Sequence, residues 1–172
     1  MSNEFAAPEI PFQTTLLVRD TCLCLHVQRA ARALARRFDL ALLPSGLTNG
    51  QFSLMMSLNR PDLPGIPPAT MGSVATLLGM DRTTLSAAVK TLTRRGLVEV
   101  RVDSGDRRGR ILALTADGRK ALAAAAPIWK ATHAEVEGEL EDSRRSSDSG
   151  SSPERLRRDL LALARDEDAP KS

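Results

Sequence analysis

The chain has 172 residues, of which 42% are hydrophobic and 3% are aromatic, enough for one ordinary domain with a core of Leu, Val and Ala. Its two cysteines, two residues apart, cannot form a disulfide framework, and no stretch approaches the roughly 20 apolar residues of a membrane helix. The first residues, MSNEFAAPEIPF, lack the basic and apolar segments of a secretory signal. We therefore expect a soluble cytoplasmic protein without a membrane partner.

The net charge of +3 is unevenly distributed along the chain. Residues 81–120 contain ten Arg or Lys and five Asp or Glu, a local charge of +5. Residues 135–168 contain eleven acidic and six basic residues, a local charge of −5. A basic block of this kind attracts nucleic acid or an anionic membrane.

The N-terminal part predicts a flexible arm followed by a long helix. Residues 1–13 contain two prolines and little periodicity, whereas the stretch from Thr14 to Leu43 contains neither Pro nor Gly. Its apolar residues recur at helical spacing, which predicts one helix that packs on other helices or on a second copy of the chain. The apolar positions are Leu17, Cys24, Val27, Ala31, Leu34, Phe38 and Ala41.

The central part predicts a helix-turn-helix. Thr48 can cap a helix over 48–59, and a proline-rich connector over 60–69 follows, which cannot be helical. Thr70 can cap a short helix that ends at Gly79, and Asp81 can cap a longer one over 81–95. The residues expected to be buried in these helices are Phe52, Met55, Met56, Leu58, Met71, Val74, Leu77, Leu78, Leu85, Val89 and Leu92.

Two short strands complete this lobe, LVEVRV (97–102) and ILALT (111–115). The order of these elements predicts a winged helix-turn-helix over residues 48–115: a helix, a tight glycine turn, a longer helix and a hairpin. The fold class is thus mainly α with a small β-wing.

The C-terminal part predicts two more helices. Thr115 can cap a helix over 116–140, which Pro127 should kink or split. The Ser-rich segment 143–152 is expected to be a disordered insertion. The last helix, from residue 153, carries Leu156, Leu160 and Leu163 on one stripe. Residues 14–168 then form a single domain, with helices over 14–47 and 116–168 flanking the winged lobe.

The outer face of the 81–95 helix has the chemistry of a DNA-reading helix. Its small side chains allow a helix to lie deep in the major groove, and its basic side chains can reach bases or phosphates. An alternative is a solvated amphipathic helix beside a core. The residues expected at the DNA are Arg82, Thr83, Thr84, Ser86, Ala87, Lys90 and Arg94, with Arg95 also a candidate for a phosphate contact.

The hairpin tip, SGDRRGR (104–110), carries three arginines whose charges repel one another. An arginine at the tip of a wing can enter the narrow minor groove, where the potential is most negative. We expect Arg108 in that groove, Asp106 holding its guanidinium in place, and Arg107 and Arg110 on phosphates. The wing over 103–110 would then contact DNA.

The stretch DRTTLSAAVKTLTRRGLVEVRVDSGDRRGRILALTADG (81–118) resembles the core of the multiple-antibiotic-resistance-regulator (MarR) family. The resemblance lies in the D-x-R tip (Asp106, Arg108) and the closing LT-x-x-G (Leu114, Thr115, Gly118), and the flanking long helices extend it over 14–166. It implies a homodimer whose terminal helices, 14–47 and 116–168, interlock, and which binds a pseudo-palindromic operator as a repressor. The long connector and the segment 143–152 depart from the family pattern.

Two places could sense a signal. Leu23, Cys24 and Leu25 resemble the reactive-cysteine run of the family's peroxide sensors, but the tyrosines of that branch are missing. The favoured interpretation of Cys24 is a small core residue on the apolar stripe, with redox sensing as the alternative. Cys22 and His26 could instead bind a metal, although two ligands make a weak site. His26, Trp129 and His133 are candidates for an effector pocket that takes a small aromatic ligand, although the favoured interpretation of Trp129 is a core residue.

The sequence therefore predicts a sequence-specific DNA-binding regulator, a dimeric repressor released by a small ligand or by oxidation. Its partners would be double-stranded DNA and a second copy of itself. The alternative is a winged helix used for protein contacts. We expect no enzyme activity, no cofactor and no metal, because neither a paired-carboxylate site nor a phosphate loop is present.

Overall fold

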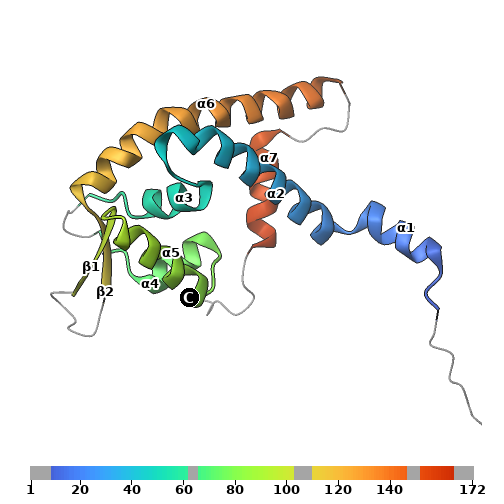
Figure 1. Ribbon diagram of the computed structural model, residues 1–172. Helices are drawn as coiled ribbons and strands as arrows, with labels where there is room; N and C mark the ends of the chain where they lie inside the picture. Colours follow the sequence, from blue (N-terminus) through green and yellow to red (C-terminus); the bar gives the residue numbers. More distant parts are fainter. Residues whose placement is uncertain (1–8, 62–65, 103–109, 147–151, 165–172) are drawn as a thin grey trace, which may run out of the picture. The chain divides into compact units, whose positions relative to one another are not determined.

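The computed structural model describes residues 9–61, 66–102, 110–146 and 152–164 (Figure 1). The chain divides into two compact units, residues 1–37 and 38–172. No described helix is both long and apolar enough to cross a membrane. The helices and strands in chain order are α1 (Phe12–Thr21), α2 (Leu23–Leu42), η1 (Leu43–Ser45), α3 (Asn49–Ser57), α4 (Met71–Leu78), α5 (Arg82–Arg94), β1 (Val98–Val102), β2 (Arg110–Leu114), α6 (Ala116–Ser146) and α7 (Pro153–Leu163).

The first unit contains a helix break where the sequence predicts one continuous helix over 14–43, so that prediction is wrong. Cys22 is extended, with φ −70° and ψ 105°, and separates α1 from α2. Just before the break, the Thr21 hydroxyl donates to the Leu17 carbonyl at 2.7 Å, and a His26 ring nitrogen lies 3.3 Å from the Asp20 carbonyl. Side-chain bonds of this kind to a helix carbonyl are local competitors of the regular backbone ladder. In addition, α1 begins at Phe12, inside the expected arm.

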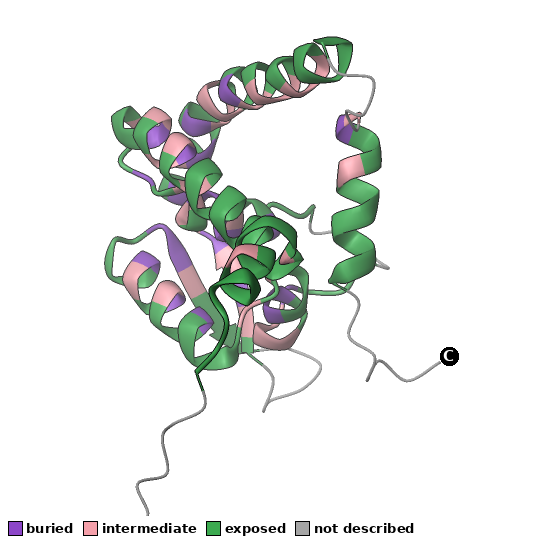
Figure 2. Cartoon of the chain, turned by 90° about the vertical axis from the view of Figure 1, so that its right-hand side faces the viewer, coloured by how far each residue is buried: buried purple, intermediate pink, exposed green. Residues whose placement is uncertain are grey.

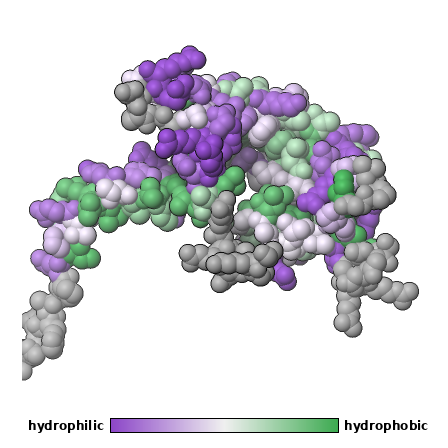
Figure 3. All heavy atoms as spheres, turned by 180° about the vertical axis from the view of Figure 1, so that it is seen from behind, coloured by the Kyte–Doolittle hydropathy of each residue, from purple (hydrophilic) through white to green (hydrophobic). Residues whose placement is uncertain are grey.

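The apolar stripe of this unit is exposed in the single chain. Leu17 is 61% exposed and Leu23 is 68% exposed, and Figure 3 shows hydrophobic residues along these helices. No residue of α1 is buried. An exposed apolar stripe of this kind marks a surface for interaction with another protein.

The second unit has one hydrophobic core, to which α3, α4, α5, the hairpin and the first half of α6 contribute (Figure 2). The largest fully buried side chains are Leu42, Leu54, Met55, Val74, Leu85, Leu92, Val98 and Leu114. The prediction that Met56 and Leu77 are buried is wrong, since they are 44% and 61% exposed. Leu54 and Ala75 are buried in addition. Both helices are apolar on several sides, so their patterns alone do not select the inner face.

The predicted caps of the helix-turn-helix are confirmed. The Thr48 and Thr70 side chains each accept from the backbone N–H three residues on, and Gln51 and Ser73 return the contact in capping boxes. Gly79, with φ 60°, ends α4 in the left-handed conformation that favours glycine. Asp81 then caps α5.

The predicted hairpin is also confirmed. β1 and β2 are antiparallel, with Val98 opposite Leu114 and Val102 opposite Arg110. The end of the connector lies beside β2, because the Leu112 N–H donates to the Ala69 carbonyl at 2.8 Å. The described residues of the 60–69 connector form no helix.

The LT-x-x-G sequence closes the hairpin against α5. The Thr115 hydroxyl donates to the Gly96 carbonyl at 2.6 Å and accepts from the Gly118 N–H at 2.9 Å. Gly118 is a requirement of this corner, because a Cβ there would lie 2.0 Å from the Leu97 carbonyl oxygen. Residues 96–97, which follow the end of α5, are thereby fixed to the start of α6.

The C-terminal helices differ from the prediction in two ways. α6 is continuous through Pro127, so of the two expected effects, a kink or a split, the split does not occur. A proline removes one hydrogen bond of the helix, and the packing of the helix on the core can offset that loss. Residues 143–146, expected to be disordered, form the last turn of α6, while 147–151 lie outside the described residues. Ser152 caps α7, and Arg157 of α7 contacts Glu137 of α6 at 2.5 Å.

Candidate nucleic-acid interface

The start of α5 is fixed by its cap. The Asp81 carboxylate accepts from the Thr84 N–H at 2.8 Å and from the Thr84 hydroxyl at 2.6 Å. The Thr84 side-chain and backbone hydrogen bonds lower the pKa of Asp81 below its ordinary value of 3.8. The carboxylate therefore stays charged at neutral pH, which favours it at the positive end of the helix. Thr84 is one of the expected DNA contacts, and its hydroxyl is bound to the Asp81 carboxylate.

The two faces of α5 separate as predicted. Leu85 and Leu92 are fully buried and Val89 is 5% exposed. The expected DNA-facing residues are all exposed on the same helix, namely Arg82, Thr83, Thr84, Ser86, Ala87, Lys90 and Arg94. The helix thus presents small and basic side chains to solvent while its leucines fix it to the core.

Arg95 has a role that the sequence did not reveal. Its guanidinium donates to the Gln51 side-chain oxygen and to the Gly46 carbonyl, both at 2.9 Å. These acceptors lie 44 and 49 residues earlier in the sequence, so no local pattern could indicate the contacts. An arginine expected on a phosphate is instead bound to its own chain.

The wing tip lies outside the described residues, including Asp106, Arg107 and Arg108. Arg110 is described: it is exposed and begins β2, opposite Val102. The paired strands β1 and β2 on either side of the tip are described, and the expected groove contact of Arg108 remains a prediction.

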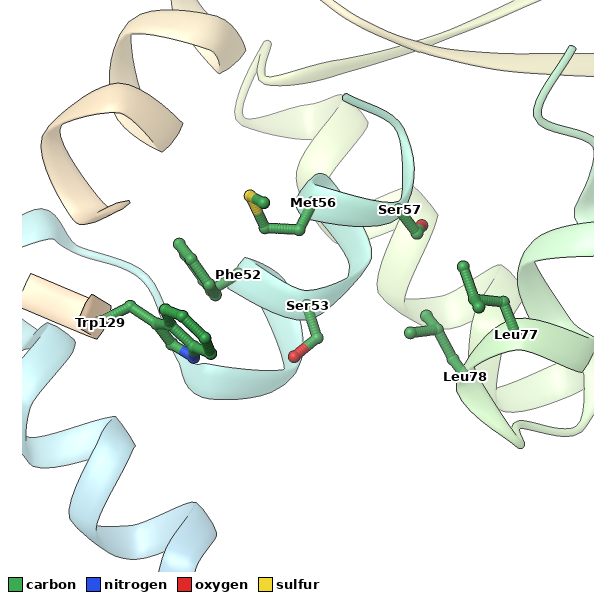
Figure 4. A pocket seen from close by; sticks show the side chains of 7 residues that line it. All are labelled: Phe52, Ser53, Met56, Ser57, Leu77, Leu78 and Trp129. Carbon is green, nitrogen blue, oxygen red and sulfur yellow. The ribbon is translucent and has the colours of Figure 1, made fainter. Parts of the chain in front are cut away.

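A cavity of about 360 Å³ lies between α3, α4 and α6 (Figure 4). Its lining is mostly apolar, formed by Phe52, Ser53, Met56, Ser57, Leu77, Leu78 and Trp129. Met56 and Leu77, which were expected in the core, are exposed and line this cavity.

Of the three expected effector residues, the structure brings two together. The Trp129 ring stacks on Phe52 at 5.9 Å and on His133 at 4.6 Å between ring centroids. His133 Nε2 lies 3.3 Å from a Glu137 carboxylate oxygen. His26 belongs to the other unit.

The two cysteines are free thiols in the first unit, Cys22 half-buried and Cys24 exposed. Gln28 donates to the Cys24 sulfur at 3.2 Å. Within this unit Cys24 is therefore not a core residue. Among the described residues, no group of three or more His, Cys, Asp or Glu could hold a metal ion.

Comparisons with known proteins agree with this geometry. A profile of the MarR family matches residues 45–109. The transcriptional regulator HosA of Escherichia coli O127:H6 is 35% identical over 94 residues, which cover 55% of this chain and 66% of HosA.

Two solved structures extend the likeness over most of the chain. The M. tuberculosis transcriptional regulator MosR in complex with DNA is 37% identical, covers 84% of this chain and 94% of its own, and has a TM-score of 0.69. The repressor CouR, of Rhodococcus jostii RHA1, bound to a 23-mer DNA duplex, is 28% identical over 92% of this chain and 100% of its own, with a TM-score of 0.66. The resemblance seen in the sequence is thereby confirmed, and the chain belongs to the MarR family.

Proposed function

We propose that the chain is a dimeric, sequence-specific DNA-binding transcriptional repressor. The observation that carries the proposal is α5, held by Leu85 and Leu92 on one side and exposing small and basic residues on the other. Such a face fits the major groove, and residues 103–110 at the end of the hairpin would lie in the adjacent minor groove. The DNA complexes of MosR and CouR support the DNA binding that this arrangement requires.

The partner copy would cover the apolar surfaces that the single chain leaves exposed. In α1 and α2 these include Leu17 and Leu23, and in α7 they include Leu161 and Leu163, at 68% and 65% exposure. Two copies related by a twofold axis present two recognition helices, which predicts an operator with two matching half-sites.

The wing prediction is tested by Arg108→Ala. We expect operator affinity to fall by at least about tenfold, because one good groove contact contributes that much. Fluorescence anisotropy with a labelled duplex from the region upstream of the gene measures it. Arg145→Ala, which removes one exposed arginine from the end of α6, is the matched control. If both variants bound as the unaltered chain does, Arg108 would not be a groove contact.

The signal that releases the repressor would enter at the cavity beside Trp129. Trp129 is the single tryptophan of the chain, so a bound aromatic ligand should quench its fluorescence. Titration with a panel of small aromatic carboxylates should show quenching and loss of DNA binding at the same ligand concentration. Quenching without DNA release would contradict an effector role, and release by peroxide that Cys24→Ser abolishes would favour oxidation.

The alternative function, a winged helix used for protein contacts, makes a different prediction. It requires no exposed basic recognition face and no DNA affinity. A chain that shifted no upstream DNA fragment at low salt would favour it over the repressor.

A further inference from the structure

Arg95 connects the end of the recognition helix to a corner of the fold that is distant in sequence. It is the residue that caps the C-terminal end of α5. One guanidinium nitrogen donates to Gln51 Oε1 and another to the Gly46 carbonyl, both at 2.9 Å. Gln51 lies in the first turn of α3, and Gly46 ends η1 in the left-handed conformation, with φ 68°.

Both acceptors are themselves fixed. Gln51 Oε1 also accepts from the Thr48 N–H at 3.3 Å, as part of the capping box of α3. The Gly46 N–H donates to the Leu43 carbonyl at 2.9 Å. The planar guanidinium of an arginine presents its donors in a fixed geometry. With two of them bound to two fixed acceptors, the Arg95 side chain has a defined orientation relative to Gln51 and Gly46.

We propose that Arg95 is a positioning residue for DNA binding, which fixes the direction of the recognition face instead of contacting a phosphate. This inference rests on the proposed function. The neighbouring residues hold the same point from the other side, since Thr115 at the start of α6 bonds the Gly96 carbonyl. The end of α5 is thus fixed between the α3 corner and α6.

The hydrogen bond between Arg95 and Gln51 also links the recognition helix, α5, to the wall of the cavity. Gln51 directly precedes Phe52, which lines the cavity and stacks on Trp129. A shift of α3 on ligand binding would therefore reach α5 through Arg95. Arg94, the adjacent residue, has no side-chain hydrogen bond or ion pair within the described parts of the chain, and it serves as a matched control.

The test compares Arg95→Met with Arg94→Met, which remove the same charge one residue apart. DNA affinity is measured at several salt concentrations with a duplex from the upstream region. Removing one phosphate contact on B-DNA lowers the slope of log K against log salt by about 0.9. We expect this for Arg94→Met, whereas Arg95→Met should weaken binding about tenfold at every salt concentration with the slope unchanged.

Gln51 variants provide an independent test that does not alter Arg95. Gln51→Met removes one of the two contacts of Arg95 and leaves the bond to the Gly46 carbonyl, so it should weaken binding less than Arg95→Met does. The double variant should be no weaker than Arg95→Met alone, because the contact that Gln51→Met removes is already lost there. Gln51→Glu keeps an acceptor for Arg95 and retains the capping box, since glutamate serves at that position as glutamine does, so its affinity should equal that of the unaltered chain. Thermal unfolding of each variant identifies any that fails to fold, in which case the two Gln51 variants decide.

The outcomes separate the inference from the function beneath it. A slope lowered by about 0.9 in Arg95→Met, or additive losses in the double variant, would overturn the positioning role while leaving DNA binding intact. An unaltered chain that bound no duplex would overturn the proposed function and this inference together.

Discussion

Replacement of Gly118 by alanine should lower the free energy of unfolding by about 3 kcal/mol, the upper range for an overpacked core site. The added Cβ would lie 2.0 Å from the Leu97 carbonyl oxygen and 3.0 Å from its carbon. Neither group can yield easily: the Leu97 carbonyl accepts from the Thr115 N–H at 3.2 Å, and Gly118 is buried beside Thr115. The clash therefore involves backbone on both sides, and urea unfolding followed by circular dichroism measures its effect.

Gly138→Ala in the same helix is the control for this change. Gly138 is exposed, and a Cβ there would meet nothing within 4 Å. The substitution should raise stability by about 1 kcal/mol, because alanine favours a helix interior over glycine. Equal stability of the Gly118→Ala protein and the unaltered chain would show that the corner between β2 and α6 is not as tight as described.

Replacement of Ala87 by glutamate should reduce DNA affinity by at least about a hundredfold, since a carboxylate placed against phosphates costs several kcal/mol. Ala87 is exposed at the middle of α5, so the fold should tolerate the longer side chain. Ala87→Gln is almost identical in shape and lacks the charge. It should lose far less affinity at low salt, and the difference between the two variants should shrink as salt rises. Anisotropy titrations of both variants make the comparison.

Equal losses of DNA affinity in Ala87→Glu and Ala87→Gln would mean that the size of the side chain causes the loss and that position 87 is distant from the phosphates. No loss for either would remove α5 from the interface. In both cases an unchanged melting temperature confirms that the fold has been preserved.

Most of the winged lobe could be predicted because its signals are local. Thr48, Thr70 and Asp81 each lie directly before an apolar run, and each caps the helix expected of it. The spacing of Leu85, Val89 and Leu92 selects one face of α5 for the core. When the inner face of this helix is known, the outer face and its candidate contacts follow directly.

The features that escaped prediction depend on contacts distant in sequence or on weak local signals. The break at Cys22 has neither proline nor glycine to mark it. The contacts of Arg95 and the need for glycine at position 118 arise only when separate elements meet. The exposure of Met56 and Leu77 follows from a cavity between three helices, which no single helix pattern can indicate.

The central claim, that this chain is a DNA-binding regulator, is tested most directly by the salt dependence of binding to a duplex from its own upstream region. If α5 and the wing bind as proposed, log K should fall linearly with log salt, and affinity should drop by at least about a thousandfold between about 50 and about 200 mM salt. Absence of binding at low salt, or an affinity that salt leaves unchanged, would contradict the account.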